Sequence, residues 1–90
     1  MNGRFAISTA GHDAGKVYVI VGKDKEILLL ADGGERKIAN PKKKNKKHVS
    51  IIGHENENEL LTMISEKKRG CDEAIRQAIH HFIKDNLKFK

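Results

Sequence analysis

The first fifty residues alternate between apolar and polar positions with the two-residue period of β-strands. Phe5 and Ile7 alternate with small or polar neighbours, which predicts a strand with one buried face. The pattern predicts five strands, over residues 4–9, 17–21, 26–31, 35–39 and 48–52, separated by turn signals at 22–25, 32–34 and 40–41. Five short strands joined by tight turns favour a mainly β fold, a small and strongly bent barrel of meander order.

The connection between the first two predicted strands, residues 10–16, is the most distinctive loop. It holds Gly11 and Gly15 and ends in Lys16, with Asp13 offsetting the charge of that lysine. Two glycines in one short loop indicate a backbone that needs positive φ or that approaches another group closely. A plain turn between strands explains the glycines equally well. A polar loop of this kind is also typical of one that contacts a partner.

The second half of the chain follows the helical period instead. Asn56 or Asn58 caps a predicted helix that ends near Gly70, and Cys71 and Asp72 begin a second helix with Asp72 as its N-cap. Apolar residues of this second helix recur at the spacing of one helix face, namely Ile75, Ala78, Ile79, Phe82 and Ile83.

A length of 90 residues suits one small folded unit. We expect residues 1–52 to form the barrel and residues 53–90 to form a helical pair packed on it. No apolar run approaches the roughly 20 residues of a membrane helix, and the N-terminus lacks the apolar stretch of a signal peptide. The single cysteine, Cys71, excludes an internal disulfide and fits a reducing, cytoplasmic compartment.

The net charge of +6 lies in one block of the sequence. Residues 36–48 hold seven Lys or Arg and no acid, whereas residues 1–35 sum to −1 and residues 49–90 to 0. A flexible solvated loop is one interpretation of this block. The other is contact with a polyanion, because seven uncompensated charges repel one another until a partner relieves them. Lysine is a point charge, which favours contact with a phosphate backbone over reading of bases.

Other chemistry finds little support in the sequence. The five histidines and Cys71 lack the spacing of zinc ligands, since His80 and His81 are adjacent and point about 100° apart on a helix. Cys71 at a helix start has no base positioned beside it, so packing in the core is the better interpretation. Without an acid pair, a nucleophile motif or a phosphate loop, we expect no catalysis, no metal and no cofactor.

Two stretches resemble known families. Residues 3–21, G-R-F-A-I-S-T-A-G-H-D-A-G-K-V-Y-V-I-V, resemble a KOW motif, in the version of the archaeal and eukaryotic large-subunit ribosomal protein family fourteen-e. Residues 32–48, D-G-G-E-R-K-I-A-N-P-K-K-K-N-K-K-H, resemble a group of small bacterial KOW-domain proteins described as RNA-binding or ribosomal-protein-like. The resemblance covers about residues 3–52. It implies a five-stranded SH3-like barrel that binds RNA, in particular ribosomal RNA.

The resemblance and the charge block together define a set of predicted RNA-binding residues. The invariant glycine of the family corresponds to Gly11, and His12 stands where the family often has Arg or Pro. Arg4 and Lys16 are expected at the two edges of the glycine-containing loop. The full set is Arg4, Gly11, His12, Gly15, Lys16, Arg36, Lys37, Lys42, Lys43, Lys44, Lys46, Lys47 and His48.

The expected function is therefore that of a non-catalytic RNA-binding protein associated with the ribosome or translation. Phe5 and Phe82 fit the core, which leaves Tyr18 as the candidate exposed ring and favours structured or double-stranded RNA over stacked single strands. Ribosomal proteins are possible further partners, and neither a small-molecule substrate nor a membrane is expected. The alternative is a protein-interaction module in translation or transcription that binds an acidic partner through the basic block. A membrane-surface role is less supported, because the block has no hydrophobic insertion face beside it.

Overall fold

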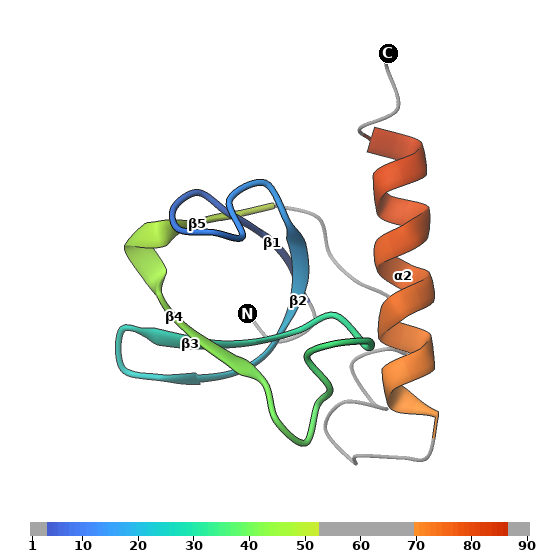
Figure 1. Ribbon diagram of the computed structural model, residues 1–90, viewed down its shortest axis with the longest axis horizontal. Helices are drawn as coiled ribbons and strands as arrows, with labels where there is room; N and C mark the ends of the chain where they lie inside the picture. Colours follow the sequence, from blue (N-terminus) through green and yellow to red (C-terminus); the bar gives the residue numbers. More distant parts are fainter. Residues whose placement is uncertain (1–3, 53–69, 87–90) are drawn as a thin grey trace.

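The computed structural model describes residues 4–52 and 70–86, in which five strands form one antiparallel sheet and a long helix lies against it (Figure 1). The elements are β1 (Phe5–Ser8), β2 (Val17–Asp24), β3 (Ile27–Ala31), β4 (Lys42–Asn45), the 3₁₀ turn η1 (Lys46–His48), β5 (Val49–Ile51) and α2 (Cys71–Asn86). The strand order is β4-β3-β2-β1-β5. The mainly β prediction is therefore confirmed.

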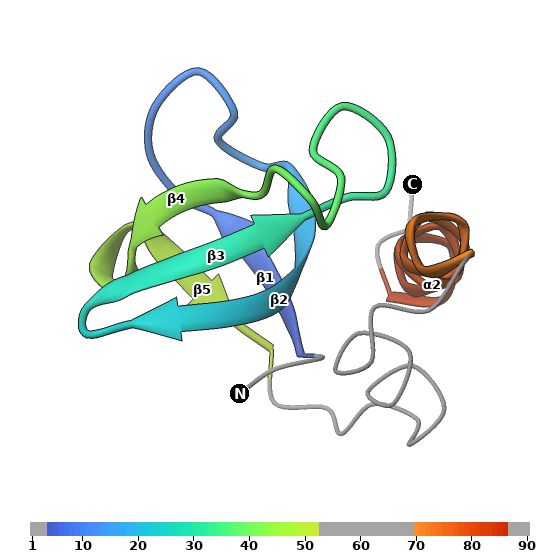
Figure 2. The same cartoon turned by 90° about the horizontal axis from the view of Figure 1, so that it is seen from below.

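The sheet curls strongly, yet its hydrogen bonding stays open. In the described residues β4 pairs with β3 and β5 pairs with β1, and the two edge strands are joined through η1 rather than to each other. Figures 1 and 2 show the strands bending around a common centre. The predicted barrel is therefore corrected to an open, curved sheet. The turn η1 follows β4 directly and redirects the chain, so that β5 pairs with β1 and not with β4.

Strand β2 is buried on both faces because it separates two hydrophobic clusters. Val17 and Val19 pack toward α2, whereas Tyr18 and Ile20 point into the concave side of the sheet. This double burial explains why the strand reads as a continuous apolar run rather than an alternation. The pairing of β2 with β3 shifts register between Ile20 and Gly22, a β-bulge that bends the strand.

Helix α2 covers the convex side of β1 and β2 with the apolar face that its sequence predicts. Ile75, Ile79 and Phe82 are buried there, and the rings of Phe5 and Phe82 stack with centroids 4.4 Å apart. Cys71 is buried in the same cluster, which confirms its assignment to the core. Ile83, expected on the buried face, instead remains 41% exposed.

The predicted helical pair reduces to one helix in the described part of the chain. The first predicted helix, from Asn56 or Asn58 to Gly70, falls almost entirely on residues 53–69, outside the described residues. Asp72 is not the N-cap of α2, because it lies within the helix. Its carboxylate oxygen accepts the backbone N–H of Ile38 at 2.7 Å. The side chain therefore fastens the β3–β4 loop to the start of the helix.

The fourth strand lies later in the chain than the apolar pattern predicts. Residues 35–39 belong to the β3–β4 loop, and Lys42–Asn45 pairs with β3 instead. Asp32 holds the loop, since its backbone N–H donates to the Arg36 carbonyl and its carboxylate accepts the N–H groups of Gly34 and Arg36. The predicted hairpin at Asp32-Gly33-Gly34 is thus a folded loop of about ten residues.

Candidate nucleic-acid interface

The loop between β1 and β2, residues 9–16 and hereafter the glycine loop, is folded upon itself. The Gly15 N–H donates to the Ser8 carbonyl at 2.7 Å, and the Lys16 N–H donates to the Asp13 carbonyl at 2.9 Å. Gly11 and Gly15 both have positive φ, of 89° and 92°. The backbone N–H groups of residues 10–13 make no hydrogen bond to a described residue. Backbone N–H groups without a partner in such a turn can donate hydrogen bonds to an anion.

Asp13 is the centre of this loop. Its carboxylate accepts hydrogen bonds from the Ser8 hydroxyl at 2.8 Å and from the Tyr18 hydroxyl at 2.7 Å. The Lys44 ammonium lies 2.8 Å from one carboxylate oxygen and the Lys42 ammonium 3.2 Å from the other. We call these five residues the Asp13 cluster. Because two of its members lie in β4, the cluster fastens the glycine loop across the mouth of the curved sheet.

Within the Asp13 cluster, the pKa values of Asp13 and Tyr18 are shifted in opposite directions. The hydrogen bond from Lys44 is the largest cause that holds the pKa of Asp13 far below its usual range, and it prevails over the opposing effect of burial. Burial, followed by the hydrogen bond that the Tyr18 hydroxyl donates to Asp13, raises the pKa of Tyr18 well above its usual range. The carboxylate therefore stays ionised and the phenol stays neutral at physiological pH. Tyr18 is only 2% exposed, so it is not the exposed ring that its sequence position suggested.

Lys16 belongs to a second ion cluster that joins two loops. Its ammonium lies 3.0 Å from Asp32 and 3.4 Å from Glu35, and it sits 5.6 Å from the centre of the Tyr18 ring. The hydrogen bond to Asp32 is the largest cause that raises the pKa of Lys16. Figure 2 shows the glycine loop and the β3–β4 loop rising on the same side of the sheet. The sequence suggested that Asp13 offsets the charge of Lys16. In the structure Lys16 pairs instead with Asp32 and Glu35, and Asp13 pairs with two lysines of β4.

The lysines of β4 alternate between two directions. Lys42 and Lys44 pair in register with Leu30 and Leu28, which point into the concave core, whereas Lys43 pairs with the half-buried Leu29. The side chain of Lys44 is only 11% exposed, so its aliphatic stem lies over the core while its ammonium reaches Asp13. Lys43 is exposed. The strand thus divides its charge into an inner pair and an outer residue.

The turn η1 continues the basic segment beside the glycine loop. The Asn45 side chain accepts the Lys47 N–H at 3.0 Å and caps the turn. The Lys46 N–H donates to the Glu26 carbonyl, and the His48 carbonyl accepts the Thr9 N–H at 2.9 Å. The ammonium groups of Lys43, Lys46 and Lys47 form no ion pair with a described residue, and we call them the outer lysines.

The structure brings some predicted site residues together and separates others. His12 and His48 are exposed, and the bond between Thr9 and His48 places their segments side by side. Arg4 lies beyond the start of β1, where its carbonyl bonds Ile20, at the opposite end from the glycine loop. Its expected place at the loop edge is therefore wrong. Arg36 and Lys37 lie in the β3–β4 loop, on the same side of the sheet as the glycine loop.

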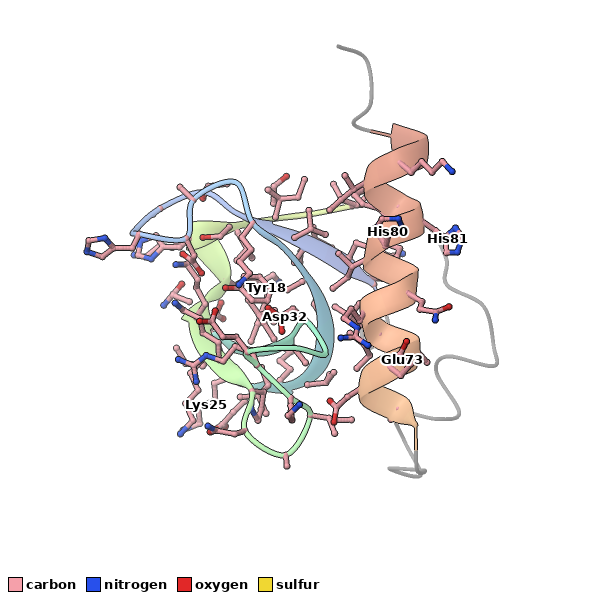
Figure 3. The ribbon with its side chains drawn as sticks, turned by 45° about the vertical axis from the view of Figure 1, so that its right-hand side comes forward. Tyr18, Lys25, Asp32, Glu73, His80 and His81 are labelled. Atoms are coloured by element: carbon pink, nitrogen blue, oxygen red, sulfur yellow. The ribbon has the colours of Figure 1, made fainter. Side chains whose placement is uncertain are left out.

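Sequence reasoning missed the residues that organise the interface. Ser8, Asp13, Tyr18 and Asp32 fix the loops, yet each reads locally as an ordinary strand or turn residue. One local signal was available: Asp13 is the only acid in the glycine loop. Its lysine partners lie about thirty residues later, beyond the reach of any local pattern. Figure 3 shows Tyr18 and Asp32 within the curve of the sheet, while His81 points away from the sheet on α2.

A shallow groove of about 450 Å³ lies between the two loops and α2. Its lining is Gly15, Lys16, Val17, Asp32, Gly34, Arg76, Ile79 and Ile83. Its cations are already paired, Lys16 with Asp32 and Arg76 with Glu73. In the described residues, no three His, Cys, Asp or Glu side chains gather as metal ligands would.

Among the residues described, no helix combines the length and the apolar character needed to cross a membrane. Comparison with protein-family models gives no match to this chain, and comparison with curated proteins gives none either.

Proposed function

We propose that this chain is a non-catalytic RNA-binding protein of the KOW type, with an SH3-like fold, that contacts the backbone of structured RNA in ribosomes or translation. The observation that carries the proposal is the position of the outer lysines next to the glycine loop. The Thr9–His48 hydrogen bond joins the loop to η1, and the Lys44–Asp13 ion pair joins it to β4. A rigid loop with open amides beside unpaired ammonium groups suits a phosphate backbone.

The aromatic residues of the described part favour structured RNA as the partner. Phe5, Tyr18 and Phe82 are each less than a tenth exposed. Sequence-tolerant binding of single strands depends on exposed rings on which bases stack. A cationic surface without such rings recognises shape and phosphate position, as proteins that bind double-stranded RNA do.

The proposed mechanism is electrostatic capture followed by docking of the glycine loop. The outer lysines together with Arg36 and Lys37 supply five charges without an ion-pair partner in the described residues. Each phosphate contact changes the slope of log K against log salt by roughly 0.7–0.9. If all five contact phosphates, a slope of roughly 3.5–4.5 is expected. If all seven basic residues of the block did so, the slope would be roughly 4.9–6.3.

The test compares two double variants that remove the same charge. K43Q/K47Q removes two outer lysines, and K23Q/K84Q removes two exposed lysines elsewhere, on β2 and on α2. Binding to a ribosomal RNA fragment with a long stem is measured by gel shift across a salt series. K43Q/K47Q is expected to lower the slope by roughly 1.4–1.8, whereas the control stays close to the wild type.

Two results would count against the proposal. Equal losses in both double variants would show that binding follows net charge and not this surface. A protein partner that co-purifies after RNase treatment and is lost in K43Q/K47Q would favour the alternative function, an interaction module for an acidic protein.

A further inference from the structure

We propose that Asp13 is a specificity-determining residue: it withholds Lys42 and Lys44 from polyanions, so that external phosphates meet the outer lysines. The inference rests on the proposed RNA-binding function and deepens it. It concerns which of the clustered cations face the partner. Within the sequence all of these lysines look equivalent, since five of them lie within residues 42–47.

The geometry around Asp13 supports this selection. Its two oxygens are divided between the two ammonium groups, at 2.8 Å for Lys44 and 3.2 Å for Lys42. The Lys44 ammonium also donates to the Ala10 carbonyl at 2.8 Å, so two of its three protons are already used inside the protein. A carboxylate held between two ammonium groups occupies the place that a phosphate would take.

The surroundings of Asp13 make this arrangement persistent. The Ser8 and Tyr18 hydroxyls hold the carboxylate from below, and the side chains of Asp13 and Lys44 are each only 11% exposed. To contact these ammonium groups, a phosphate would have to displace the Asp13 carboxylate, which the Ser8 and Tyr18 hydroxyls already hold in place. Exposed outer lysines carry no such cost, because Lys43 and Lys47 bond no carboxylate of a described residue.

The consequence is a limit on non-specific affinity. With Lys42 and Lys44 withheld, the protein gains fewer contacts from an arbitrary polyanion, and binding depends more on how well a partner fits the fixed loop and the outer lysines. Release of the two lysines would add contacts that any polyanion can make. By holding them, Asp13 raises the preference for a fitting RNA and lowers the affinity for polyanions in general.

The decisive variant is Asp13→Asn, which keeps an acceptor for the hydroxyls but removes the charge. Asp24→Asn is the matched control, because it removes one exposed carboxylate at the β2–β3 turn and releases no lysine. Binding to heparin and to a stem-containing RNA is measured across a salt series. We expect Asp13→Asn to steepen the heparin slope by roughly 0.7–1.8 and to narrow the ratio of RNA to heparin affinity, with little change for Asp24→Asn.

Lysine acylation followed by mass spectrometry tests the same idea without any RNA. In the wild type Lys44 should react slowest, Lys42 next, and Lys43 and Lys47 fastest. In Asp13→Asn the rates of Lys42 and Lys44 should rise at least several-fold. The wild-type pattern keeps the inference testable even where Asp13→Asn fails to fold, because fast reaction of Lys44 in the native protein would overturn it.

The outcomes separate this inference from the proposed function. Equal slopes for Asp13→Asn and Asp24→Asn, or unchanged reactivity of Lys42 and Lys44, would overturn the role of Asp13 even if RNA binds. A wild type that fails to bind any RNA, with the heparin slope steepened in Asp13→Asn, would instead reject the proposed function and leave the withholding of the two lysines supported.

Discussion

The glycine loop and the β3–β4 loop, which rise on the same side of the sheet, need their glycines for different structural reasons. In the glycine loop, Gly15 has positive φ and open space around it, so a Cβ atom there would meet nothing within 4 Å. In the β3–β4 loop, Gly33 also has positive φ, but a Cβ there would overlap the carbonyl oxygen of Asp72 and lie 2.8 Å from the Arg76 nitrogen. One loop needs a backbone conformation, and the other needs contact with a helix.

The difference shows where each loop obtains its rigidity. The β3–β4 loop is wedged against α2, and its Ile38 N–H is held by Asp72. No backbone atom of α2 is wedged against the glycine loop in this way among the described residues; the loop is held by the ion pairs and hydroxyls around Asp13 and by the Thr9–His48 hydrogen bond. A loop fixed by electrostatics can leave its outer surface open to a ligand. The β3–β4 loop is instead fixed by steric fit at Gly33, although Glu35 and Lys37 of the same loop remain exposed.

The largest effect is expected from Gly33→Ala. The substitution combines the cost of positive φ, about 1–2 kcal/mol, with overpacking against the helix backbone, about 1–3 kcal/mol or more. Stability should fall by about 2–5 kcal/mol in urea unfolding followed by circular dichroism. A loss below 1 kcal/mol would show that α2 moves away from the loop at little cost.

Asp13→Ala should come next, because it leaves two ammonium groups and two hydroxyls without their shared partner. Hydrogen bonds to charged groups contribute about 1.5–3 kcal/mol each at most, so a loss of about 2–3 kcal/mol is expected for this partly exposed cluster. The pKa of Asp13 is lowered from 3.8 in the folded state. Its contribution is therefore present above that value and is lost as the pH falls further below it.

The pH dependence gives this variant its own control. Between about pH 5 and pH 2 the wild type should lose more stability than Asp13→Ala, so the difference between their free energies of unfolding should narrow steadily as the pH falls. Parallel curves over this range would contradict the assignment of a lowered pKa to Asp13.

Gly15→Ala should have a smaller effect than Gly33→Ala, since only the backbone conformation is penalised. A loss of about 1–2 kcal/mol is expected, and Gly15→Asn should recover part of it because asparagine tolerates positive φ. Thermal unfolding of the two variants measures the difference. A loss as large as that of Gly33→Ala would mean that the glycine loop is packed as tightly as its neighbour.

Lys43→Gln should change stability least, by less than about 0.5 kcal/mol, because the residue is exposed and unpaired with any described acid. Lys44→Gln, one position later, removes an ammonium that bonds both Asp13 and Ala10 and should cost more. Urea unfolding of the pair therefore tests the inner and outer division of the β4 lysines. Equal losses of stability in the two variants would contradict the division into inner and outer lysines.

Much of the fold follows from local patterns in the sequence. The predicted strands at 4–9, 17–21, 26–31 and 48–52 contain β1, the first half of β2, β3 and β5, because these segments have buried apolar residues at strand spacing. The helical period from Ile75 to Ile83 likewise predicts α2, although the predicted N-cap, Asp72, lies inside the helix. In each case the side chains that bury the element are themselves apolar.

The rest depended on contacts that no local pattern contains. Strand β4 has no apolar residue, and its inward side chains are lysines whose charge is satisfied by Asp13. The weak alternation around Ile38 therefore predicts the fourth strand at residues 35–39 instead. The burial of Tyr18 and the pairing of Lys16 with Asp32 have the same origin, since both depend on a loop that folds back over the sheet.

The position of β4 at one edge of the open sheet has a consequence for self-association. In the described residues it pairs with β3 alone, so its outer row of backbone groups is available to a strand from another molecule. Charged edge strands, rich in lysine above all, discourage such additions. Loss of these charges would turn the edge into a template for growth by stacking of identical strands. The β4 lysines, of which we propose only Lys43 for RNA contact, therefore also help to keep this small sheet from self-associating.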